Sequence, residues 1–208
     1  MKGCKPMSYA NCLCRKLINK RNRYRLKNNT FSLFSSNCNG CCICHDLGLQ
    51  FRSPFVNLSL DAEDYIKFLK SPQEYLSASL EFQKDTDKGY PVGKLKDITI
   101  YFVHYHSPEE AREAWERRKE RIDWENLFVL MTDRDGCTDE LLQEFDTLPY
   151  RNKAVFTHIP MPHIRSAVYI PGFENEDAVG NGDAFVNRFS GKKYFDYFDY
   201  VKWFNEGK

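Results

Sequence analysis

Acidic residues are missing from the first 45 positions of this 208-residue chain, and Asp46 is the first of them. Nine of the 30 lysines and arginines lie before that position, so a basic stretch precedes a net acidic body. A like-charged stretch of this kind favours contact with an anionic surface, a nucleic acid or the protein's own acidic body. We predict a basic arm over residues 1–29 and a single domain over residues 30–208.

Long apolar runs are also absent. No stretch approaches the ~18 apolar residues of a membrane span, and no apolar segment follows the first basic residues as in a signal peptide. We therefore expect a cytoplasmic protein whose eight cysteines are mostly reduced. Residues 13–27 are expected to form a basic helix, which is either solvated or attached to an anionic surface such as the inner membrane.

Repeats and low-complexity tracts are lacking as well, and the 42% of apolar residues is enough to fill a core. Helices are expected to open after Cys38, at Asp61, at Thr138, and at the two Ser-Pro-x-Glu motifs that start with Ser71 and Ser107. The expected strands are residues 31–36, 53–60, 97–106, 126–133, 153–159 and 166–170. Alternating strands and helices predict a three-layer α/β domain, with a Rossmann-like, mostly parallel sheet and helices on both faces.

Aromatic side chains are concentrated near the C-terminus, where they occupy seven of the eleven positions from Tyr194 to Phe204. Tyr194, Tyr197, Phe198, Val201 and Phe204 are at helical spacing. We predict a C-terminal helix that docks this face on the core.

Reactive side chains follow the ends of several expected strands, where ligands bind in an open parallel sheet. A thiol, imidazoles and a carboxylate at one edge are the groups that nucleophilic catalysis by cysteine requires. We predict Cys38 as the nucleophile. His106 or His158 would act as the base, and Asp133 would orient it.

Binding groups are expected around the same thiol. A helix opening after Cys38 would favour its thiolate, and the helix N–H groups, with Asn37, would hold an oxyanion or a phosphate. Arg134 would bind a donor phosphate or an acidic sugar. The other candidates for binding are Asn39, Gly40, His45 and His104. Each histidine has a structural alternative as a core or surface side chain, and Asp133 has one as a helix cap.

A metal site is the alternative for the cysteine-rich turn. Cys38, Cys41 and Cys44 follow the C-x2-C-x2-C spacing of iron–sulfur ferredoxins, but Gly48 stands where the next cysteine would fall. Zinc would need a second pair of ligands from elsewhere in the chain. We therefore expect no metal, and we expect Cys41, Cys42 and Cys44 to be small buried residues.

Three separated motifs point to one bacterial family. They are "SSNCNG" with the following "HDLGLQFRSPFVNL", then "SPEEAREAWERRKERIDWENLFVLMTDRDGCT", and "FDTLPYRNKAVFT". From about Arg15 onward the chain resembles the bacterial proteins grouped as domain of unknown function nineteen-nineteen, often labelled exopolysaccharide biosynthesis proteins. The family pattern Ser-Asn-Asn-Cys-x-Gly-Gly is matched at Cys38 and Gly40 but not at Ser36 and Cys41.

The resemblance implies a role close to capsule or exopolysaccharide synthesis. In that setting we expect a cysteine-dependent transferase that moves an acyl-type group from an activated donor, such as acyl-coenzyme A, to a sugar or lipid-linked glycan. No bound cofactor is expected. A sugar-ester hydrolase and a non-catalytic module that binds a sugar nucleotide or a polysaccharide are the alternatives. The acidic body and the lack of a base-stacking sheet pattern argue against a nucleic acid as partner.

Overall fold

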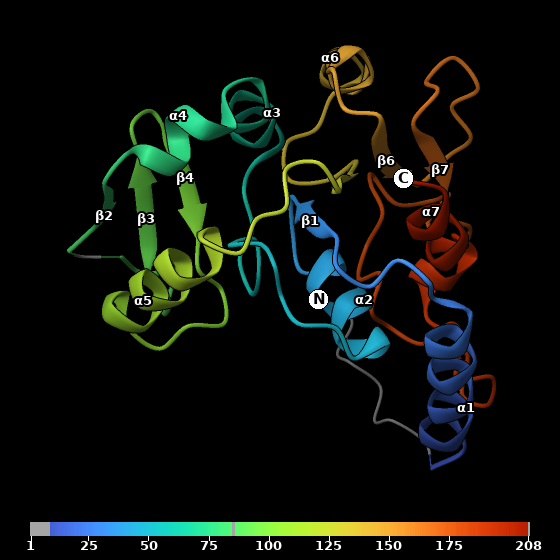
Figure 1. Ribbon diagram of the computed structural model, residues 1–208. Coiled ribbons are helices and arrows are strands. Elements are labelled where there is room, and N and C mark those ends of the chain that lie inside the picture. The colour runs from blue at the N-terminus through green and yellow to red at the C-terminus, as the bar shows by residue number, and fades with distance from the viewer. Residues whose placement is uncertain (1–8, 85, 208) are drawn as a thin grey trace.

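Figure 1 shows the computed structural model of the protein, which describes residues 9–84 and 86–207. The part of the predicted basic arm over residues 1–8 lies outside the described residues. The helices are α1 (Tyr9–Arg25), α2 (Asn39–Leu47), α3 (Ala62–Lys70), α4 (Pro72–Ser77), α5 (Pro108–Lys119), α6 (Asp139–Thr147), the 3-10 helix η1 (Tyr194–Tyr197) and α7 (Tyr200–Glu206). The strands are β1 (Ser32–Ser35), β2 (Leu80–Phe82), β3 (Val92–Leu95), β4 (Ile98–Tyr101), β5 (Leu127–Thr132), β6 (Asn152–Thr157) and β7 (Ala167–Tyr169).

Four strands form a parallel sheet in the order β1-β5-β6-β7, and each was expected from the sequence. Most of their residues are buried, as in β5, and this explains their nearly continuous apolar sequences. The register pairs Ser35 with Leu130 and Thr132 with Phe156. The carboxyl ends of β1, β5 and β6 therefore lie side by side.

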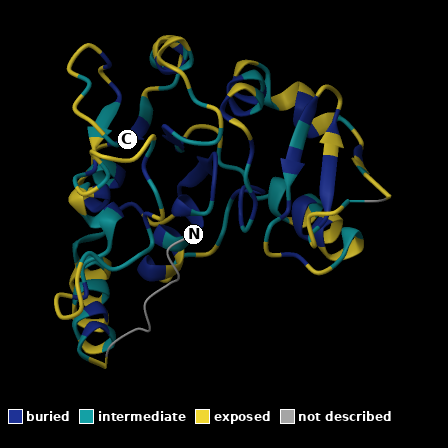
Figure 2. Ribbon diagram, turned by 180° about the vertical axis from the view of Figure 1, so that it is seen from behind, coloured by how far each residue is buried: buried dark blue, intermediate teal, exposed yellow. Residues whose placement is uncertain are grey.

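Alternate residues of these strands enter two separate apolar cores. Leu33 and Phe128 pack with α2 and α7, whereas Phe34 and Val129 pack with α3, α5 and α6. β1, β5 and β6 are mostly buried, while Figure 2 shows exposed residues on the outer sides of the helices. The expected α/β fold is confirmed at this level.

Strands β2, β3 and β4 form a second, antiparallel sheet on the opposite side of the molecule from α1. The prediction that residues 97–106 belong to the parallel sheet is therefore wrong. Burial alternates along β4, as expected for a sheet with one solvated face. The predicted strand over residues 53–60 is a loop whose Ser59 makes a single bridge to Tyr101 of β4.

The aromatic C-terminal segment is divided into η1 and α7 instead of one helix. Asp199 caps α7 by accepting a hydrogen bond from the Lys202 N–H, and this new start shifts the buried face. Tyr200 and Phe204 are fully buried, while Tyr197 remains 40% exposed. The prediction of a single continuous helix is therefore wrong, but the segment does dock on the core, through Val201 and Phe204 and the partly buried Tyr194 and Phe198.

The predicted basic helix is present as α1, and one side of it is buried. Arg15 is only 6% exposed, and Asn11 exchanges hydrogen bonds with the backbone of Asn187 and Gly191. Helix α1 is therefore not fully solvated. Within the described residues, every helix is too short or too polar to cross a membrane.

Candidate functional site

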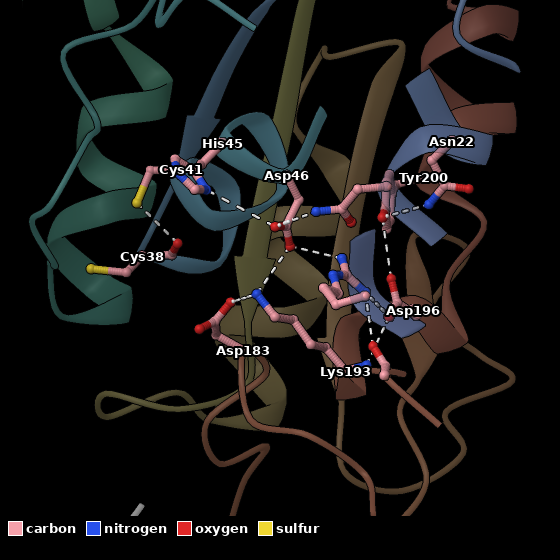
Figure 3. Close-up of polar contacts among 12 residues, drawn as sticks. Asn22, Cys38, Cys41, His45, Asp46, Asp183, Lys193, Asp196 and Tyr200 are labelled. Atoms are coloured by element: carbon pink, nitrogen blue, oxygen red, sulfur yellow. Dashed lines mark hydrogen bonds and ion pairs between the residues drawn. The ribbon is translucent and has the colours of Figure 1, made fainter. Parts of the chain in front are cut away.

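Three thiols gather where β1 leads into α2, and we call Cys38, Cys41 and Cys42 the sulfur cluster. Cys38 occupies the N-cap position of α2, so the predicted helix does open at the next residue. The Cys41 Sγ lies 3.1 Å from the carbonyl oxygen of Cys38 (Figure 3). The Cys38 Sγ is 3.8 Å from the carbonyl oxygen of Leu58. The cluster thus lies between the first turn of α2 and the loop over residues 51–60.

The three thiols of the sulfur cluster shift one another's pKa values. Cys38 and Cys42 hold the Cys41 pKa well below the ordinary thiol range, against the opposing effect of burial. Their closeness to Cys41, with burial, raises the pKa of Cys38 and of Cys42. Cys41 was expected to be a small buried residue, and it is buried, but it is also the site where a thiolate is best stabilised.

Two groups from other elements add to this effect. The backbone of Asn57 and the nearby imidazole of His104 both lower the pKa of Cys41. The Asn57 Oδ1 lies 3.6 Å from the Cys41 Sγ. Asn57 has a left-handed backbone with φ of 61°, a conformation that Asn tolerates better than most residues. The unpredicted Asn57 therefore forms one wall of the cluster.

The first N–H groups of α2 are already used inside the protein. The Asn39 N–H donates to the Asn37 Oδ1, and the Gly40 N–H donates to the Ser35 Oγ. Gly40 is also required sterically, because a Cβ there would lie 2.5 Å from the Ser35 Cβ. The expectation that these two N–H groups hold an oxyanion or a phosphate is therefore wrong.

Asn37 nevertheless offers one donor. Its Nδ2 is buried and has no hydrogen-bond partner in the part of the chain that the structure describes. A buried donor without a partner is costly and is commonly satisfied by a ligand or a water molecule. Asn39, in contrast, donates to the Thr132 Oγ1 at 3.3 Å and ties α2 to β5.

Asp133 and His158 form a close pair at the ends of β5 and β6. The Asp133 Oδ2 lies 2.6 Å from the His158 Nδ1 and accepts the His158 backbone N–H at 2.7 Å. The Asp133 Oδ1 accepts the Val179 N–H at 2.8 Å. The carboxylate is buried, whereas the imidazole is 18% exposed. This is the arrangement by which a carboxylate fixes the orientation of a catalytic imidazole.

Arg134 follows directly and is 40% exposed. It contacts Asp135 through its Nε at 3.2 Å and the Gly180 carbonyl oxygen through its Nη1 at 3.4 Å. Its charge is close enough to Cys38 to lower the pKa of that thiol, although the hydrogen bond and burial outweigh it. Arg134 therefore lies within electrostatic reach of the sulfur cluster, as expected for a residue that binds an anionic donor.

The other predicted histidines do not reach the edge of the parallel sheet. His104 and His106 follow β4 of the antiparallel sheet, and both are exposed. His106 donates its backbone N–H to the Glu110 carboxylate at the start of α5. The backbone nitrogen of His104 lies 3.4 Å from the carbonyl oxygen of Asn57, and this places His104 near Cys41. His45 is 83% exposed in the last turn of α2, one turn after Cys41.

A buried charge network at the other end of α2 was not predicted (Figure 3). Asp46 accepts from Arg15 at 2.7 Å and from Lys193 at 3.0 Å. Arg15 also pairs with Asp196, and Lys193 pairs with Asp183 at 2.6 Å. A single acidic residue after a long basic stretch was the one sequence signal for it. The network connects α1 and α2 to the C-terminal segment and holds the helix that carries the cysteines.

A sizeable cavity lies at the opposite edge of the parallel sheet from the cysteines. It has a volume of about 670 Å³, and its lining includes Trp124, Leu127 at the start of β5 and Asn152 at the start of β6. Along the described strands the order β1-β5-β6-β7 has no reversal, and a reversal is what creates the binding crevice of a doubly wound sheet. No three His, Cys, Asp or Glu side chains of the described residues are arranged to hold a metal ion.

Two comparisons with known proteins bear on this site. Residues 9–205 match the family described as Domain of unknown function (DUF1919). A protein of Haemophilus influenzae named "Uncharacterized protein" is 48% identical over 196 residues, which cover 90% of this chain and 94% of the relative. The family match includes α1, the sulfur cluster and the Asp133–His158 pair within one continuous region.

Proposed function

Because this chain belongs to the family of DUF1919 proteins, a domain of unknown function, we propose its role from geometry: it is a cysteine-dependent enzyme that transfers an acyl-type group. The carrying observation is the position of the half-buried Cys38 at the N-cap of α2, beside Cys41 and within electrostatic reach of Arg134. An activated thiolate is the form in which cysteine attacks carbonyl carbon.

The proposed first step is thioester exchange at Cys38. Cys38 loses its proton to solvent and attacks the carbonyl carbon of a thioester donor such as acyl-coenzyme A. Its sulfur–carbon bond forms, the donor's carbon–sulfur bond breaks, and the departing thiolate takes a proton from solvent. The unpartnered Asn37 Nδ2 is placed one residue away to stabilise the oxyanion.

The second step transfers the group to an acceptor hydroxyl. His158, oriented by Asp133, takes the proton of the hydroxyl while its oxygen attacks the acyl carbon, and Cys38 leaves as a thiolate. A sugar or lipid-linked glycan is the acceptor we propose, in the setting of capsule or exopolysaccharide synthesis. If water takes its place, the same residues give a sugar-ester hydrolase.

We also propose where such an enzyme would act and how its core is classified. The exposed basic side of α1 supports attachment to the cytoplasmic face of the inner membrane. The parallel sheet, with α2 and α7 on one face and α3 and α6 on the other, supports a small Rossmann-like, three-layer unit.

The experiment is to trap the acyl-enzyme. Purified protein is incubated with a panel of acyl-coenzyme A thioesters, quenched in acid and analysed by intact-protein and peptide mass spectrometry. We expect an acyl adduct on Cys38 that is absent from the Cys38→Ser variant. Cys137→Ser, which removes a half-buried thiol outside the cluster, should keep it. An adduct that persists in Cys38→Ser, or none with any thioester, contradicts the proposal.

A sugar-binding module is the second candidate, and the cavity at the other edge of the sheet favours it. Trp124 is 41% exposed there, and aromatic faces stack well on sugars; Lys70 and Arg151 add positive charge for a nucleotide phosphate. In calorimetric titrations with a sugar nucleotide, this function predicts that Trp124→Ala loses binding while Cys38→Ser retains it. The transferase proposal predicts the loss of acyl-enzyme in Cys38→Ser instead.

A further inference from the structure

Cys38 and Cys41 occupy a Cys-x-x-Cys pair, "CNGC", that follows a parallel strand and opens a helix. Cys38 is the N-cap residue of α2, and Cys41 lies three residues later in the first turn. This is the placement in which paired cysteines are commonly redox-active, because the first helical turn favours a thiolate.

The geometry allows the two sulfurs to be joined after a local adjustment. Cys38 already has helical φ and ψ of −66° and −7°, and helical residues three apart have their Cβ atoms about 5–6 Å from each other. A disulfide needs Cβ atoms about 3.5–4.5 Å apart. The Cys41 Sγ already lies 3.1 Å from the Cys38 carbonyl oxygen, so closure needs rotation of both side chains and an adjustment of the first turn that draws the two Cβ atoms together.

The neighbouring thiols are worse partners. Cys42 follows Cys41 directly, so a bridge between them would strain the backbone. Cys44 lies one turn further along in the apolar core, where burial raises its pKa to about 12. Of the cysteines in α2, Cys41 is therefore the best resolving partner for the more exposed Cys38.

We propose that Cys38 and Cys41 are a reversible disulfide site, which the structure shows in its reduced, dithiol form. The oxidant is a low-molecular-weight disulfide such as oxidised glutathione. Cys38 loses its proton to solvent and attacks one sulfur of the oxidant, forming a mixed disulfide and releasing a thiolate, which takes a proton from solvent. Cys41 likewise loses its proton to solvent, and its thiolate then attacks the Cys38 sulfur and releases the second thiolate, which is protonated by solvent.

The net reaction converts two protein thiols and one small disulfide into one protein disulfide and two small thiols. If the proposed transferase function is correct, on which this consequence rests, oxidation removes the Cys38 nucleophile. The enzyme would then be inactive when oxidised and active again after reduction.

Differential alkylation of the intact wild-type protein tests the disulfide without any activity assay. The protein is equilibrated with oxidised glutathione, unfolded in N-ethylmaleimide, reduced, and then labelled with iodoacetamide before peptide mapping. We expect Cys38 and Cys41 to carry the second label, and Cys42 and Cys44 the first. The intact protein should be lighter by two hydrogen atoms, and dithiothreitol should restore its mass.

Variants provide the matched control. Cys42→Ser should still lose two hydrogen atoms, whereas Cys38→Ser and Cys41→Ser should not, with circular dichroism confirming that each variant is folded. The second label on a different pair, a lasting glutathione adduct, or a wild-type protein that stays reduced would overturn the proposal. The acyl-enzyme experiment, done in reducing buffer, separately decides whether the proposed function holds.

Discussion

Asp46 is the residue on which the position of α2 depends most. The side chain of Asp46 is 7% exposed and that of Arg15 is 8% exposed. The side chain of Lys193 is 12% exposed. Burial alone would raise the pKa of Asp46, but the charges of Lys193 and Arg15 outweigh it and lower the pKa. A buried carboxylate of this kind is stable only because its charge is fully compensated.

Replacing Asp46 with Asn should therefore lower the free energy of unfolding by about 2–3 kcal/mol. Breaking a buried pair commonly costs about 3–5 kcal/mol, and here each cation keeps a second carboxylate, Asp196 or Asp183. Urea denaturation followed by circular dichroism measures the change. Asp199→Asn, at the exposed pair with Arg25, should cost less than about 1 kcal/mol. Equal losses in the two variants would contradict this account.

The same substitution has a pH signature. Folding lowers the pKa of Asp46. The stabilisation that its charge gives to the folded protein is therefore complete above the pKa of the unfolded state, about 3.9, and is lost as the pH falls through the pKa of the folded state. The difference in urea midpoint between wild type and Asp46→Asn should be constant at pH 5–7 and should shrink below about pH 4. A difference that grows on acidification would show that the sign is wrong.

Among the elements, two helices with the same opening motif differ in how they are capped. Ser107 accepts a hydrogen bond from the Glu110 N–H at 3.2 Å and caps α5. Ser71 opens α4, yet its side chain makes no capping bond, because its backbone is turned to φ of −144° and ψ of 56°. The prediction of a serine cap is confirmed for α5 and wrong for α4.

Ser107→Ala should therefore cost about 1 kcal/mol of stability, while Ser71→Ala should be nearly neutral. Thermal unfolding of both variants, measured under identical conditions, separates the two cases. A larger loss of stability in Ser71→Ala than in Ser107→Ala would mean that the observed capping hydrogen bond does not determine how much each serine stabilises the protein.

The parallel strands were predictable because their burial leaves near-continuous apolar runs, as in β5. The antiparallel sheet was not, although "DITIY" contains its signature: Ile98 and Ile100 alternate with the more polar Thr99 and Tyr101. β2 has three residues and β3 contains Gly93, so neither carries a strong pattern. Because the antiparallel sheet was not predicted, His104 and His106 were expected at the edge of the parallel sheet.

Only part of the candidate site could be read from the sequence. Asp133 and His158 were brought together by a simple rule, since adjacent parallel strands end side by side. The charge preference of Cys41 depends on the neighbouring thiols of Cys38 and Cys42. The closeness of Asn57 depends on a loop that the sequence presented as a strand. Contacts of this kind arise from tertiary packing and leave no periodic signal.

For the molecule as a whole, the outer side of α1 is its most unusual surface. Tyr9, Leu13, Leu17 and Tyr24 lie along one exposed stripe, with exposures of 81, 47, 68 and 92%. Basic side chains that include Lys16 and Lys20 are exposed beside them. An apolar stripe flanked by lysines and arginines is typical of helices that lie on anionic lipid.

We predict binding to vesicles that contain phosphatidylglycerol and much weaker binding to phosphatidylcholine alone. Vesicle flotation should show that binding falls as salt rises from 0.1 to 1 M, over which the Debye length shortens from about 10 to about 3 Å. Leu17→Asp should reduce binding several-fold. Ile159→Asp, at an exposed apolar residue outside α1, should not. Equal binding to both lipids would exclude this role.

The network around Asp46 also sets an order of events during translation. Asp46 is made early, but Lys193 is separated from it by 147 positions, and ribosomes add roughly 5–20 residues per second. The helix that carries the cysteines must therefore wait, with Arg15 as the one cation of the network already made, until almost the entire chain has been synthesised. Its final anchorage is consequently a late step of biogenesis, which delays mature thiol chemistry until the C-terminal segment has left the ribosome.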